Sequence, residues 1–355
     1  MSNGADRTDN ECAPATVTAV VVSYHSGPLL KYCLAALLAE LPVGELVVVD
    51  NGNAPAEAAL LDALAATEPR LRLVRPGGNL GFAAACNRAA AEATGAWLAF
   101  VNPDLVVSPG ALAKVVAALA TRPDAWLCGA RLLDPDGREQ RGGRRDVLTP
   151  WRSVVEATGL WRLFPRHPHF SRFNLHTSPP PAGIVEVPTI SGAFMVLPAA
   201  AWRRLGGMDE RLFLHVEDID LCLRVLKAGA RVLYCADASV IHRQGSSDAT
   251  RLFVGWHKTR GLVRYFFKHF RGPYPAWSLA LIAVLLWLRF AAVALVGLPA
   301  DTVRIGRRWL ARTTGADPTP AAAPLPPTCA TSATGISMAR PPASLQRKAK
   351  STSSK

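Results

Sequence analysis

Residues 17–51, VTAVVVSYHSGPLLKYCLAALLAELPVGELVVVDN, contain the pattern that decides the fold. The β-branched run 17–23 predicts a buried strand, 29–41 has the apolar spacing of a helix, and 45–49 predicts a second short strand. Two parallel strands joined by a helix are the unit from which a parallel sheet is built. The second strand ends in Asp50-Asn51-Gly52, so a carboxylate follows it directly.

The same alternation continues along the chain and predicts an α/β fold. We expect strands at 71–74, 97–101, 190–197 and 231–235, and helices at 56–66, 82–93, 199–205 and 220–228. Such alternation implies a mostly parallel sheet with helices on both faces. Residues 137–181 lose the periodicity and are rich in Arg, Pro, His and Trp, which predicts an irregular insertion or flexible loop. Ligands of such folds bind beyond the carboxyl ends of the strands, where Asp50 and Asp104 fall.

The positive charge lies in the C-terminal third. Residues 251–355 hold 16 of the 40 Lys and Arg residues but only two of the 27 acidic residues. The sequence pI of about 9.9 raises nucleic-acid binding as a possibility. The basic residues are interleaved with a long apolar stretch and with no recognisable nucleic-acid module, so we expect no nucleic-acid partner.

Residues 256–312 predict an element that associates with a membrane. The segment 276–298 is apolar and long enough to cross a bilayer, but Arg289 lies within it. Basic and aromatic residues alternate before it, from Trp256 to Arg271, and arginines follow it. This pattern favours an element that lies on an anionic lipid surface, and leaves a single membrane span open.

The ends of the chain and its cysteines predict a chain that stays on the cytoplasmic side. Residues 1–15 and 313–355 have the composition of a disordered leader and a disordered tail, and Met1–Pro14 lacks the basic and apolar regions of a signal peptide. The seven cysteines include no CxxC pair, and most lie in apolar runs. They are typical of reduced core residues.

Each polar motif has a structural and a functional interpretation. Asp50-Asn51-Gly52 is either a tight turn or a place where Asp50 accepts hydrogen bonds from a base or a ribose. Gly77-Gly-Asn-Leu-Gly81 is either a glycine turn or a nucleotide contact through unpaired helix N–H groups. It matches neither GxGxxG nor GxxxxGK[ST], which argues against a dinucleotide fold or a P-loop.

The remaining motifs carry carboxylates and a histidine. Asn102-Pro-Asp104 is either a turn or a source of oxygen ligands for Mg²⁺ or Mn²⁺ on a diphosphate. Glu217-Asp218 either places negative charge at a helix N-terminus or supplies a general base. His242 is either an ordinary loop histidine or a metal ligand.

Together, in this order and at these distances, the motifs resemble the family 2 glycosyltransferases over roughly residues 16–271. The motifs are Val21-Val-Ser-Tyr24, Val47-Val-Val-Asp-Asn51, Asn79-Leu-Gly-Phe82, Asn102-Pro-Asp104, Ser191-Gly-Ala193, Glu217-Asp-Ile-Asp-Leu221 and His242-Arg-Gln-Gly245. The branch they resemble most is the bacterial rhamnosyltransferases that act on sugars linked to polyprenyl diphosphate. The basic and aromatic ending, Trp256 to His269, contributes to this likeness.

The resemblance implies a GT-A fold, a Rossmann-like mixed sheet with helices on both faces, over residues 16–255. It implies inverting, metal-assisted transfer in which Asp218 is the base, with Glu217 as its nearest competitor. The residues implied to bind the nucleotide sugar are Ser23, Tyr24, Asp50, Asn79, Gly81, Asn102 and Asp104. Asp104 and His242 would hold the metal, and Gly192 and Ala193 would line the acceptor side. Asn102 replaces the first Asp of the DxD motif that many relatives carry, which puts the metal requirement in doubt.

The sequence therefore predicts a glycosyltransferase at the cytoplasmic face of a membrane. The expected donor is dTDP-rhamnose, with a UDP-sugar as the alternative, and the expected acceptor is a saccharide linked to a polyprenyl diphosphate. Two other classes stay open on the alternation of elements alone, namely a Rossmann-type oxidoreductase and a non-catalytic membrane adaptor.

Overall fold

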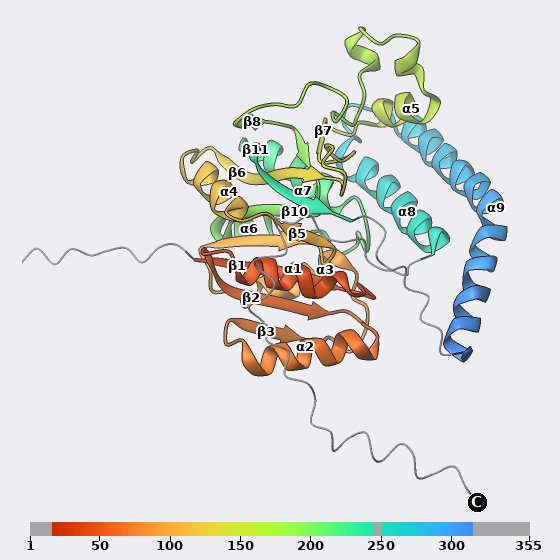
Figure 1. The fold of residues 1–355 in the computed structure, drawn as a ribbon. Coiled ribbons are helices and arrows are strands. Elements are labelled where there is room, and N and C mark those ends of the chain that lie inside the picture. Colours follow the sequence, from red (N-terminus) through yellow and green to blue (C-terminus); the bar gives the residue numbers. More distant parts are fainter. Residues whose placement is uncertain (1–15, 244–249, 315–355) are drawn as a thin grey trace, which may run out of the picture. The chain divides into compact units, whose positions relative to one another are not determined.

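The computed structural model describes residues 16–243 and 250–314, with side chains up to Val296 (Figure 1). The leader expected at 1–15 lies outside these residues, as does the tail expected at 313–355 apart from its first two residues. Among the described cysteines, the five at positions 33, 86, 128, 222 and 235 are buried free thiols, as expected. Cys12 and Cys329 lie outside the described residues.

A nine-stranded mixed sheet forms the centre of the fold, in the order β3-β2-β1-β4-β10-β6-β11-β5, with β8 paired to β11. Strands β3, β2, β1 and β4 are parallel, and β10 runs antiparallel between β4 and β6. A separate two-stranded sheet joins β7 to β9. The strands are β1 (Val17–Ser23), β2 (Val43–Asp50), β3 (Leu71–Val74), β4 (Trp97–Val101), β5 (Leu105–Val107), β6 (Ala125–Leu133), β7 (Arg144–Arg145), β8 (Ile184–Glu186), β9 (Thr189–Ile190), β10 (Phe194–Pro198) and β11 (Arg231–His242).

Helices cover both faces of this sheet. Side chains of α1, α2 and α4 pack with one face, and side chains of α3, α6 and α7 pack with the other. The described helices are α1 (Leu29–Leu38), α2 (Pro55–Thr67), α3 (Phe82–Ala90), α4 (Ala111–Ala120), α5 (Pro150–Thr158), α6 (Ala199–Leu205), α7 (Glu217–Lys227), α8 (Arg251–His269) and α9 (Ala276–Thr314), with 3₁₀ turns at Leu160–Arg162 and Pro168–Phe170.

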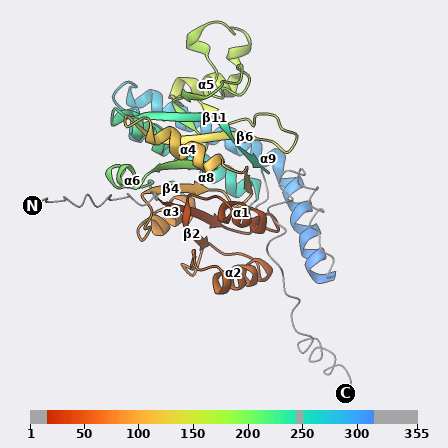
Figure 2. The same ribbon diagram turned by 60° about the vertical axis from the view of Figure 1, so that its left-hand side comes forward.

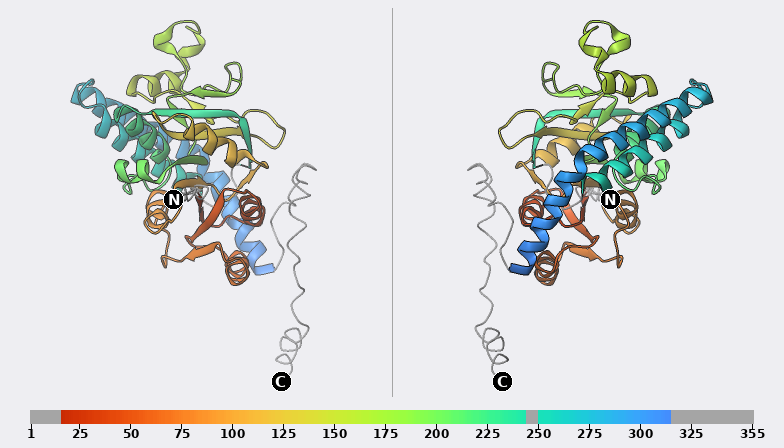
Figure 3. Two further views of the ribbon diagram at one scale, coloured as in Figure 1. Left: turned by 90° about the vertical axis from the view of Figure 1, so that its left-hand side faces the viewer. Right: turned by 90° about the vertical axis from the view of Figure 1, so that its right-hand side faces the viewer.

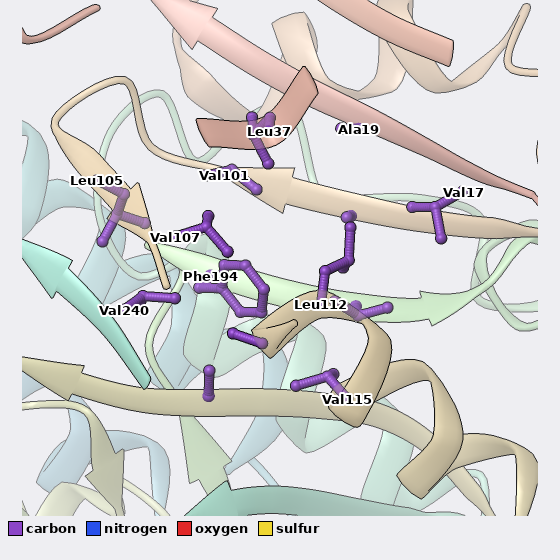
Figure 4. Close-up of a cluster of buried hydrophobic side chains, with 14 of the residues drawn as sticks. Val17, Ala19, Leu37, Val101, Leu105, Val107, Leu112, Val115, Phe194 and Val240 are labelled. Carbon is purple, nitrogen blue, oxygen red and sulfur yellow. The ribbon is translucent and has the colours of Figure 1, made fainter. Parts of the chain in front are cut away.

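The valine run of β1 shows why this sequence forms a central strand. Val17, Ala19 and Val21 point into the core on the α1 and α4 face, part of which Figure 4 shows, while Val20 and Val22 point into the opposite core. Successive side chains of a strand alternate between its faces, so a strand buried on both sides must be apolar throughout.

Two expected elements end or divide differently from the prediction. The helix expected at 29–41 ends at Leu38, and Leu41 is fully exposed, because the following proline, Pro42, disfavours helical backbone at the residue before it. The single strand expected at 190–197 is divided into β9 and β10. Between them, Ser191, Gly192 and Ala193 leave the sheet, and their backbone groups bond to other parts of the fold.

Two more corrections bear on the site. The helix expected at 220–228 begins at Glu217, and the strand expected at 231–235 continues to His242, so this histidine lies on a strand and not in a loop.

The segment 137–181 is more ordered than expected. It contains β7, α5 and the two 3₁₀ turns, and Figure 2 draws its yellow-green part above the sheet.

Helices α8 and α9 pack against each other and against the α7 side of the domain. Tyr265 and Phe266 of α8 and Phe270, which follows it, form a third buried cluster with Leu279 of α9 and Ile219 of α7. Figure 3 shows α9 as one continuous blue helix. Its segment Ala276–Val296 is long and apolar enough to span a membrane, and only 6% of the residues of its most apolar window are buried.

Candidate active site

Three parallel strands carry polar residues to one edge of the sheet. Ser23 at the end of β1 lies beside Asp50 at the end of β2, and Val21 lies beside Val101, the last residue of β4. Asn102 and Asp104 follow β4 directly. The structure thus places Asp50 and Asp104 at the carboxyl ends of β2 and β4, the two parallel strands on either side of β1, where such folds bind ligands.

Asp50 is held in a turn. Its Oδ1 accepts hydrogen bonds from the N–H of Asn53 (3.0 Å) and from that residue's side-chain amide (2.9 Å), and its Oδ2 pairs with Arg75 at 3.2 Å. Burial raises the pKa of Asp50, but the bonds from Asn53 and Arg75 together lower it by more. The pKa therefore lies below its ordinary value. Asp50 is therefore an ionised acceptor that Asn53 and Arg75 hold in position.

The neighbouring Ser23 and Tyr24 differ in how they can contribute. The hydroxyl of Ser23 is fully buried and bonds to the hydroxyl of Ser26 and to the side chain of Asn53, both at 2.9 Å. A Cβ placed on Gly52 would lie 3.5 Å from the ring of Tyr24. Ser23 therefore braces the turn after β2, while the ring of Tyr24 lies beside that turn.

The glycine loop before α3 is tied to both sides of the site. Asn79 Oδ1 accepts bonds from the side chain of Asn51 (2.9 Å) and from the N–H of Gly81 (2.8 Å). Gly81 has a φ of +82°, and a Cβ there would lie 2.6 Å from the carbonyl oxygen of Phe213. That carbonyl accepts the N–H of Phe82, the first residue of α3. The N–H groups of Gly81 and Phe82 are thus paired within the protein, and the loop links the end of β2 to the segment before α7.

Asp104 and His242 meet across two strands. Because β11 pairs with β5 so that His242 lies opposite Leu105, the ring Nε2 of His242 is 3.2 Å from Asp104 Oδ1. Both side chains are about nine-tenths buried. The sequence grouped these residues only through the family resemblance, and the strand register brings them together.

Gln140 decides which nitrogen of His242 carries hydrogen. The amide nitrogen of Gln140 donates to Asp134 (2.6 Å) and to the carbonyl oxygen of His242 (3.0 Å), so its amide oxygen faces His242 Nδ1 at 2.6 Å. An amide oxygen is an acceptor, and Nδ1 must therefore donate. In the neutral ring this leaves the lone pair of Nε2 directed at Asp104.

This donor set fits a divalent cation. A carboxylate oxygen and an imidazole nitrogen face each other, and the second nitrogen of the imidazole donates to a buried amide, as in metal sites whose ligand histidine is oriented by a second residue. Among residues 16–243 and 250–314 there is no cluster of three His, Cys, Asp or Glu side chains for a metal. A cation bound here would take its remaining ligands from water or from a bound diphosphate.

A chain of backbone bonds joins Asp104's side of the site to α7. The N–H of Asn102 donates to the carbonyl oxygen of Ala193 at 2.8 Å, and the N–H of Gly192 donates to Asp218 Oδ2 at 3.0 Å. A Cβ on Gly192 would lie 3.0 Å from the Cβ of Asp218, so any side chain there would press on this carboxylate. Gly192 and Ala193 therefore position Asp218 relative to the strand that carries Asp104.

Asp218 is an ionised carboxylate held by a cation. Arg145 Nη2 lies 2.5 Å from its Oδ2, while its Oδ1 accepts the N–H of Ile219 at 2.8 Å. Burial raises the pKa of Asp218, but the charge and hydrogen bond of Arg145 lower it more, with help from the N–H of Gly192. The pKa of Asp218 therefore lies below the usual range, and the carboxylate is free of its proton at neutral pH.

Glu217 is the opposite case. It is buried, and its Oε2 has no hydrogen-bond partner in the described residues. Burial first, and then the charge of Asp218, raises the pKa of Glu217 to about 8. At neutral pH Glu217 is protonated and Asp218 is ionised, so of the two candidates Asp218 is the one able to accept a proton.

The turn before these two carboxylates is strained. His215 and Val216 have φ angles of +64° and +77°, a conformation that is costly for a β-branched residue such as Val216. Strained backbone of this kind gathers at functional sites, where surrounding packing maintains it. The strain lies directly before Glu217 and Asp218 and sets where α7 begins.

Sequence reasoning missed several residues of this site. Arg145 lies in the segment expected to be irregular, and Gln140 precedes it. The signal available was the run Gly142-Gly-Arg-Arg145, in which two cations follow a flexible pair. Asp220 belongs to the motif Glu217–Leu221, but no role was predicted for it. It is fully buried and bonds to Arg224 (2.8 Å), Lys268 (2.7 Å) and His269 (2.7 Å), which fastens α7 to α8.

A second charged feature, the outer cavity, lies along α8 and shares Lys268 with the contacts of Asp220. It is a cavity of about 610 Å³ whose lining carries five basic side chains beside Val263 and Phe267. The basic residues are Arg211, Arg260, Arg264, Lys268 and Arg271. Because none of the candidate site residues lines this cavity, we assign it no part in the chemistry.

Comparison with known proteins agrees with this geometry. The model of "Glycosyl transferase family 2" matches residues 18–178. The N-acetylglucosaminyl-diphospho-decaprenol L-rhamnosyltransferase of Mycobacterium tuberculosis is 31% identical over 266 residues, which cover 68% of this chain and 81% of that protein. The O-antigen biosynthesis protein RfbC of Myxococcus xanthus is 31% identical over 238 residues, 64% of this chain and 17% of that protein.

Among solved structures, GalNAc-T7 with UDP, GalNAc and Mn²⁺ superposes with a TM-score of 0.53 at 16% identity, over 72% of this chain and 48% of that one. The similarity concerns the fold and confirms the expected GT-A class. With the sheet order, the carboxylates at the strand ends and the similarity to the mycobacterial enzyme, the site defines a sugar-transferring enzyme. The chain belongs to glycosyltransferase family 2. The oxidoreductase and adaptor hypotheses are thereby set aside.

Proposed function

We propose that this glycosyltransferase moves L-rhamnose from dTDP-rhamnose to a saccharide linked to a polyprenyl diphosphate, with inversion, in cell-envelope polysaccharide assembly. The observation that carries the proposal is the 31% identity to a decaprenol-linked rhamnosyltransferase across 81% of that enzyme's length. An identity spread over most of both chains includes the acceptor side as well as the nucleotide side.

In this proposal Asp218 is the general base. An inverting displacement needs one carboxylate that removes the proton of the acceptor hydroxyl while that oxygen attacks the sugar carbon from the face opposite the nucleotide. The bond from that carbon to the diphosphate oxygen breaks as the new bond forms. Asp218 fits the role because it is ionised and fixed by Arg145 and Gly192, and within the described part of the chain its Oδ1 accepts one hydrogen bond, from the N–H of Ile219.

The donor binds at the ends of β1, β2 and β4. Asp50, held in its turn, would accept hydrogen bonds from the nucleoside, with Tyr24 beside it and Ser23, Asn79 and Gly81 shaping the loops. Asp104 and His242 would hold Mg²⁺ or Mn²⁺, with Asn102 as a neutral neighbour. Bound there, the cation would neutralise charge on the departing diphosphate.

The C-terminal part would attach the enzyme to the cytoplasmic face of the membrane. Large apolar side chains of α9 are exposed along one stripe, namely Trp277, Leu281, Val284, Leu285 and Leu288. The basic cavity lies along α8, and α8 packs with α9. An apolar stripe beside basic residues suits a helix that lies in an anionic lipid surface.

Calorimetric titration of the full chain with dTDP, UDP and GDP, each with and without Mn²⁺, tests the donor side. We expect binding of dTDP that requires Mn²⁺ and is lost in Asp104→Ala. Asp124→Ala, an exposed carboxylate before β6, is the matched control and should bind as the unchanged protein does. Binding of UDP in place of dTDP would move the proposal to a UDP-sugar donor, and binding of none of the three would contradict it.

A further inference from the structure

Arg289 is the one charged residue in the apolar sequence 276–296. It follows Leu279, Ile282 and Leu286 at helical spacing, and these three side chains pack against the domain. Arg289 therefore lies on the side of α9 nearer the domain, although its side chain is exposed, while the exposed apolar stripe lies further round the helix. A charge placed for contact with lipid would lie on that exposed stripe.

Aromatic contacts show which part of α8 lies beside Arg289. The ring of Trp256 packs on Trp287 (4.7 Å between centroids) and on Phe290 (6.1 Å), the residues on either side of the 288–289 pair. A Cβ on Gly255 would lie 3.0 Å from the ring of Phe290, so the two helices approach closely here. Arg289 thus lies beside the first turns of α8, where Lys258 is found.

Lys258 connects this point to the catalytic carboxylate. Three residues further along α8, a Cβ on Gly261 would contact Val216 at 3.2 Å and the carbonyl oxygen of His215 at 3.4 Å, so this part of α8 lies against the strained turn before Asp218. Partial removal from water, then the charges of Arg289 and Arg145, lower the pKa of Lys258, and the charge of Asp218 raises it. Lys258 is therefore within electrostatic reach of all three.

These cations exceed the negative charge available to them. The charges that act most strongly on Lys258 are the cations Arg289, Arg145 and Arg141 and one carboxylate, Asp218, while Glu217 is protonated at neutral pH. The buried Nε of Arg145 has no hydrogen-bond partner in the described part of the chain. Like charges gathered without counter-charge are unfavourable, so the arrangement suits a ligand with two or more negative charges.

We propose that Arg145, Lys258 and Arg289 bind the diphosphate of the lipid-linked acceptor. The inference rests on the proposed function and adds the residues that recognise the lipid carrier. Arginine side chains bind phosphate oxygens through paired N–H groups, and lysine adds a point charge. The sugar attached to this diphosphate would then lie at Asp218, and the polyprenyl chain would leave along α9 toward its exposed apolar stripe.

The donor's diphosphate has a different place. Asp50, Asp104 and His242 come from the ends of β2, β4 and β11, whereas the three cations come from β7, α8 and α9. Asp218 contacts Arg145 of the second group directly, and through Gly192 and Ala193 it is joined to Asn102 beside the first group. A transferase with two diphosphate-linked substrates needs two separate anion sites, one on either side of its base. Asp104 and His242 belong to the first of these sites, and the three cations form the second.

Binding of geranyl diphosphate, a short and water-soluble mimic of the lipid diphosphate, tests the inference without requiring catalysis. The full chain in detergent is titrated by calorimetry as the unchanged protein, as Arg289→Gln and as Arg260→Gln. Arg260 is the matched control, an exposed cation of α8 that lines the outer cavity. We expect Arg289→Gln to weaken binding about tenfold, as loss of a charge-assisted hydrogen bond does, and Arg260→Gln to leave it unchanged.

Two further arms separate the possible sources of the signal. Geranyl monophosphate should bind more weakly than the diphosphate, and a saturating nucleoside diphosphate with Mn²⁺ should not displace geranyl diphosphate. Equal weakening in both variants, no effect of Arg289→Gln, or displacement by the nucleotide would overturn the inference. If the enzyme transfers no rhamnose yet binds geranyl diphosphate through Arg289, the proposed function fails and this site stands.

Discussion

The guanidinium of Arg145 lies 2.5 Å from Oδ2 of Asp218, although 73 positions separate these residues in the chain. The contact joins the short sheet of β7 and β9 to the first turn of α7. Its consequence is chemical as well as structural, because the cation keeps the neighbouring carboxylate ionised while Glu217, one residue earlier, retains its proton. Two adjacent carboxyl groups thus differ in protonation at neutral pH.

Replacing Asp218 by Asn should abolish the base while keeping the shape of the side chain. Because general-base catalysis contributes about 10²- to 10⁴-fold, we expect kcat for sugar transfer to fall about a thousandfold. The donor nucleotide should bind with unchanged Kd, since the donor-side residues belong to other strands. Initial rates and calorimetry measure the two quantities, and the exposed Asp124→Asn is the control. A variant that retains a tenth of the activity would refute the assignment of Asp218.

Replacing Glu217 by Gln should have a small effect on activity at pH 7, because the amide mimics the protonated acid. The pH dependence of stability gives the sharper test. In the unfolded chain Glu217 loses its proton near pH 4.5, whereas in the folded protein it does so near pH 8. Between these values the folded state binds more protons, so this group makes the free energy of unfolding decrease as pH rises.

The Gln variant lacks that dependence. Relative to the unchanged protein, its free energy of unfolding should increase steadily from about pH 5 to pH 8 and level off above pH 8. Urea denaturation of both proteins at five pH values measures the difference. A constant difference over this range would show that Glu217 is ionised in the folded protein, and would remove the argument that favours Asp218 as the base.

The central sheet was predictable from the sequence because its information is local. Runs such as 17–23 and 97–101 are apolar on both faces, and each run predicts a buried strand from its own residues alone. The positions of Asp50 and Asp104 at the ends of their strands followed from the same pattern. The family resemblance supplied the grouping of Asp104, His242 and Asp218, which lie far apart in the chain.

The parts of the site that the sequence did not indicate depend on contacts between distant segments. Arg145 and Gln140 lie in a stretch without periodicity, and their roles follow from pairing with Asp218 and His242. The division of the strand expected at 190–197 has the same origin. The N–H of Gly192 bonds to a carboxylate 26 residues away, and an apolar pattern contains no sign of such a bond.

Replacing Gln140 by Leu should weaken metal binding without touching a metal ligand. Gln140 accepts the Nδ1 hydrogen of His242 and so directs Nε2 toward Asp104. Loss of a residue that orients a ligand histidine costs about 10- to 100-fold in metal affinity. We expect the Mn²⁺ concentration needed for nucleotide binding to increase about tenfold. In the control Asp134→Asn, the side-chain oxygen can still accept from Gln140, and that concentration should change little. An unchanged requirement in Gln140→Leu would contradict the assigned tautomer.

Charges introduced on the exposed stripe of α9 should release the enzyme from lipid. Leu285 and Leu288 are about half exposed or more, so the double change to Glu should leave the fold intact and abolish sedimentation with vesicles that contain anionic lipid. Thermal unfolding of both proteins checks the fold. Leu279→Glu is the contrasting variant, because Leu279 is buried in the cluster with Phe266 and should destabilise the protein. Undiminished vesicle binding by the double variant would show that this stripe is not the lipid contact.

Asp220 should stabilise the junction of α7 and α8 in a manner that depends on pH. It is fully buried, and its three partners are Arg224, Lys268 and His269. Burial raises the pKa of Asp220, but the bonds from His269 and Lys268 and the charge of Arg224 lower it to about 2. The unfolded value is near 3.9, so the stabilisation is fully present above pH 4 and is lost as pH falls toward 2.

Asp220→Asn should therefore lower the free energy of unfolding by about 3 kcal/mol at pH 7, because it leaves buried or partly buried cations without their counter-charge. The difference from the unchanged protein should shrink as pH falls from 4 to 2, where Asp220 of the unchanged protein takes up its proton. Urea denaturation across this range measures it, with the exposed Asp124→Asn as control. A difference that stays constant with pH would mean that the carboxylate acts through packing alone.

Loss of Asp220 should also weaken the binding of geranyl diphosphate, because Lys268 and His269 lie on the helix that also carries Lys258. Mn²⁺-dependent nucleotide binding should stay unchanged.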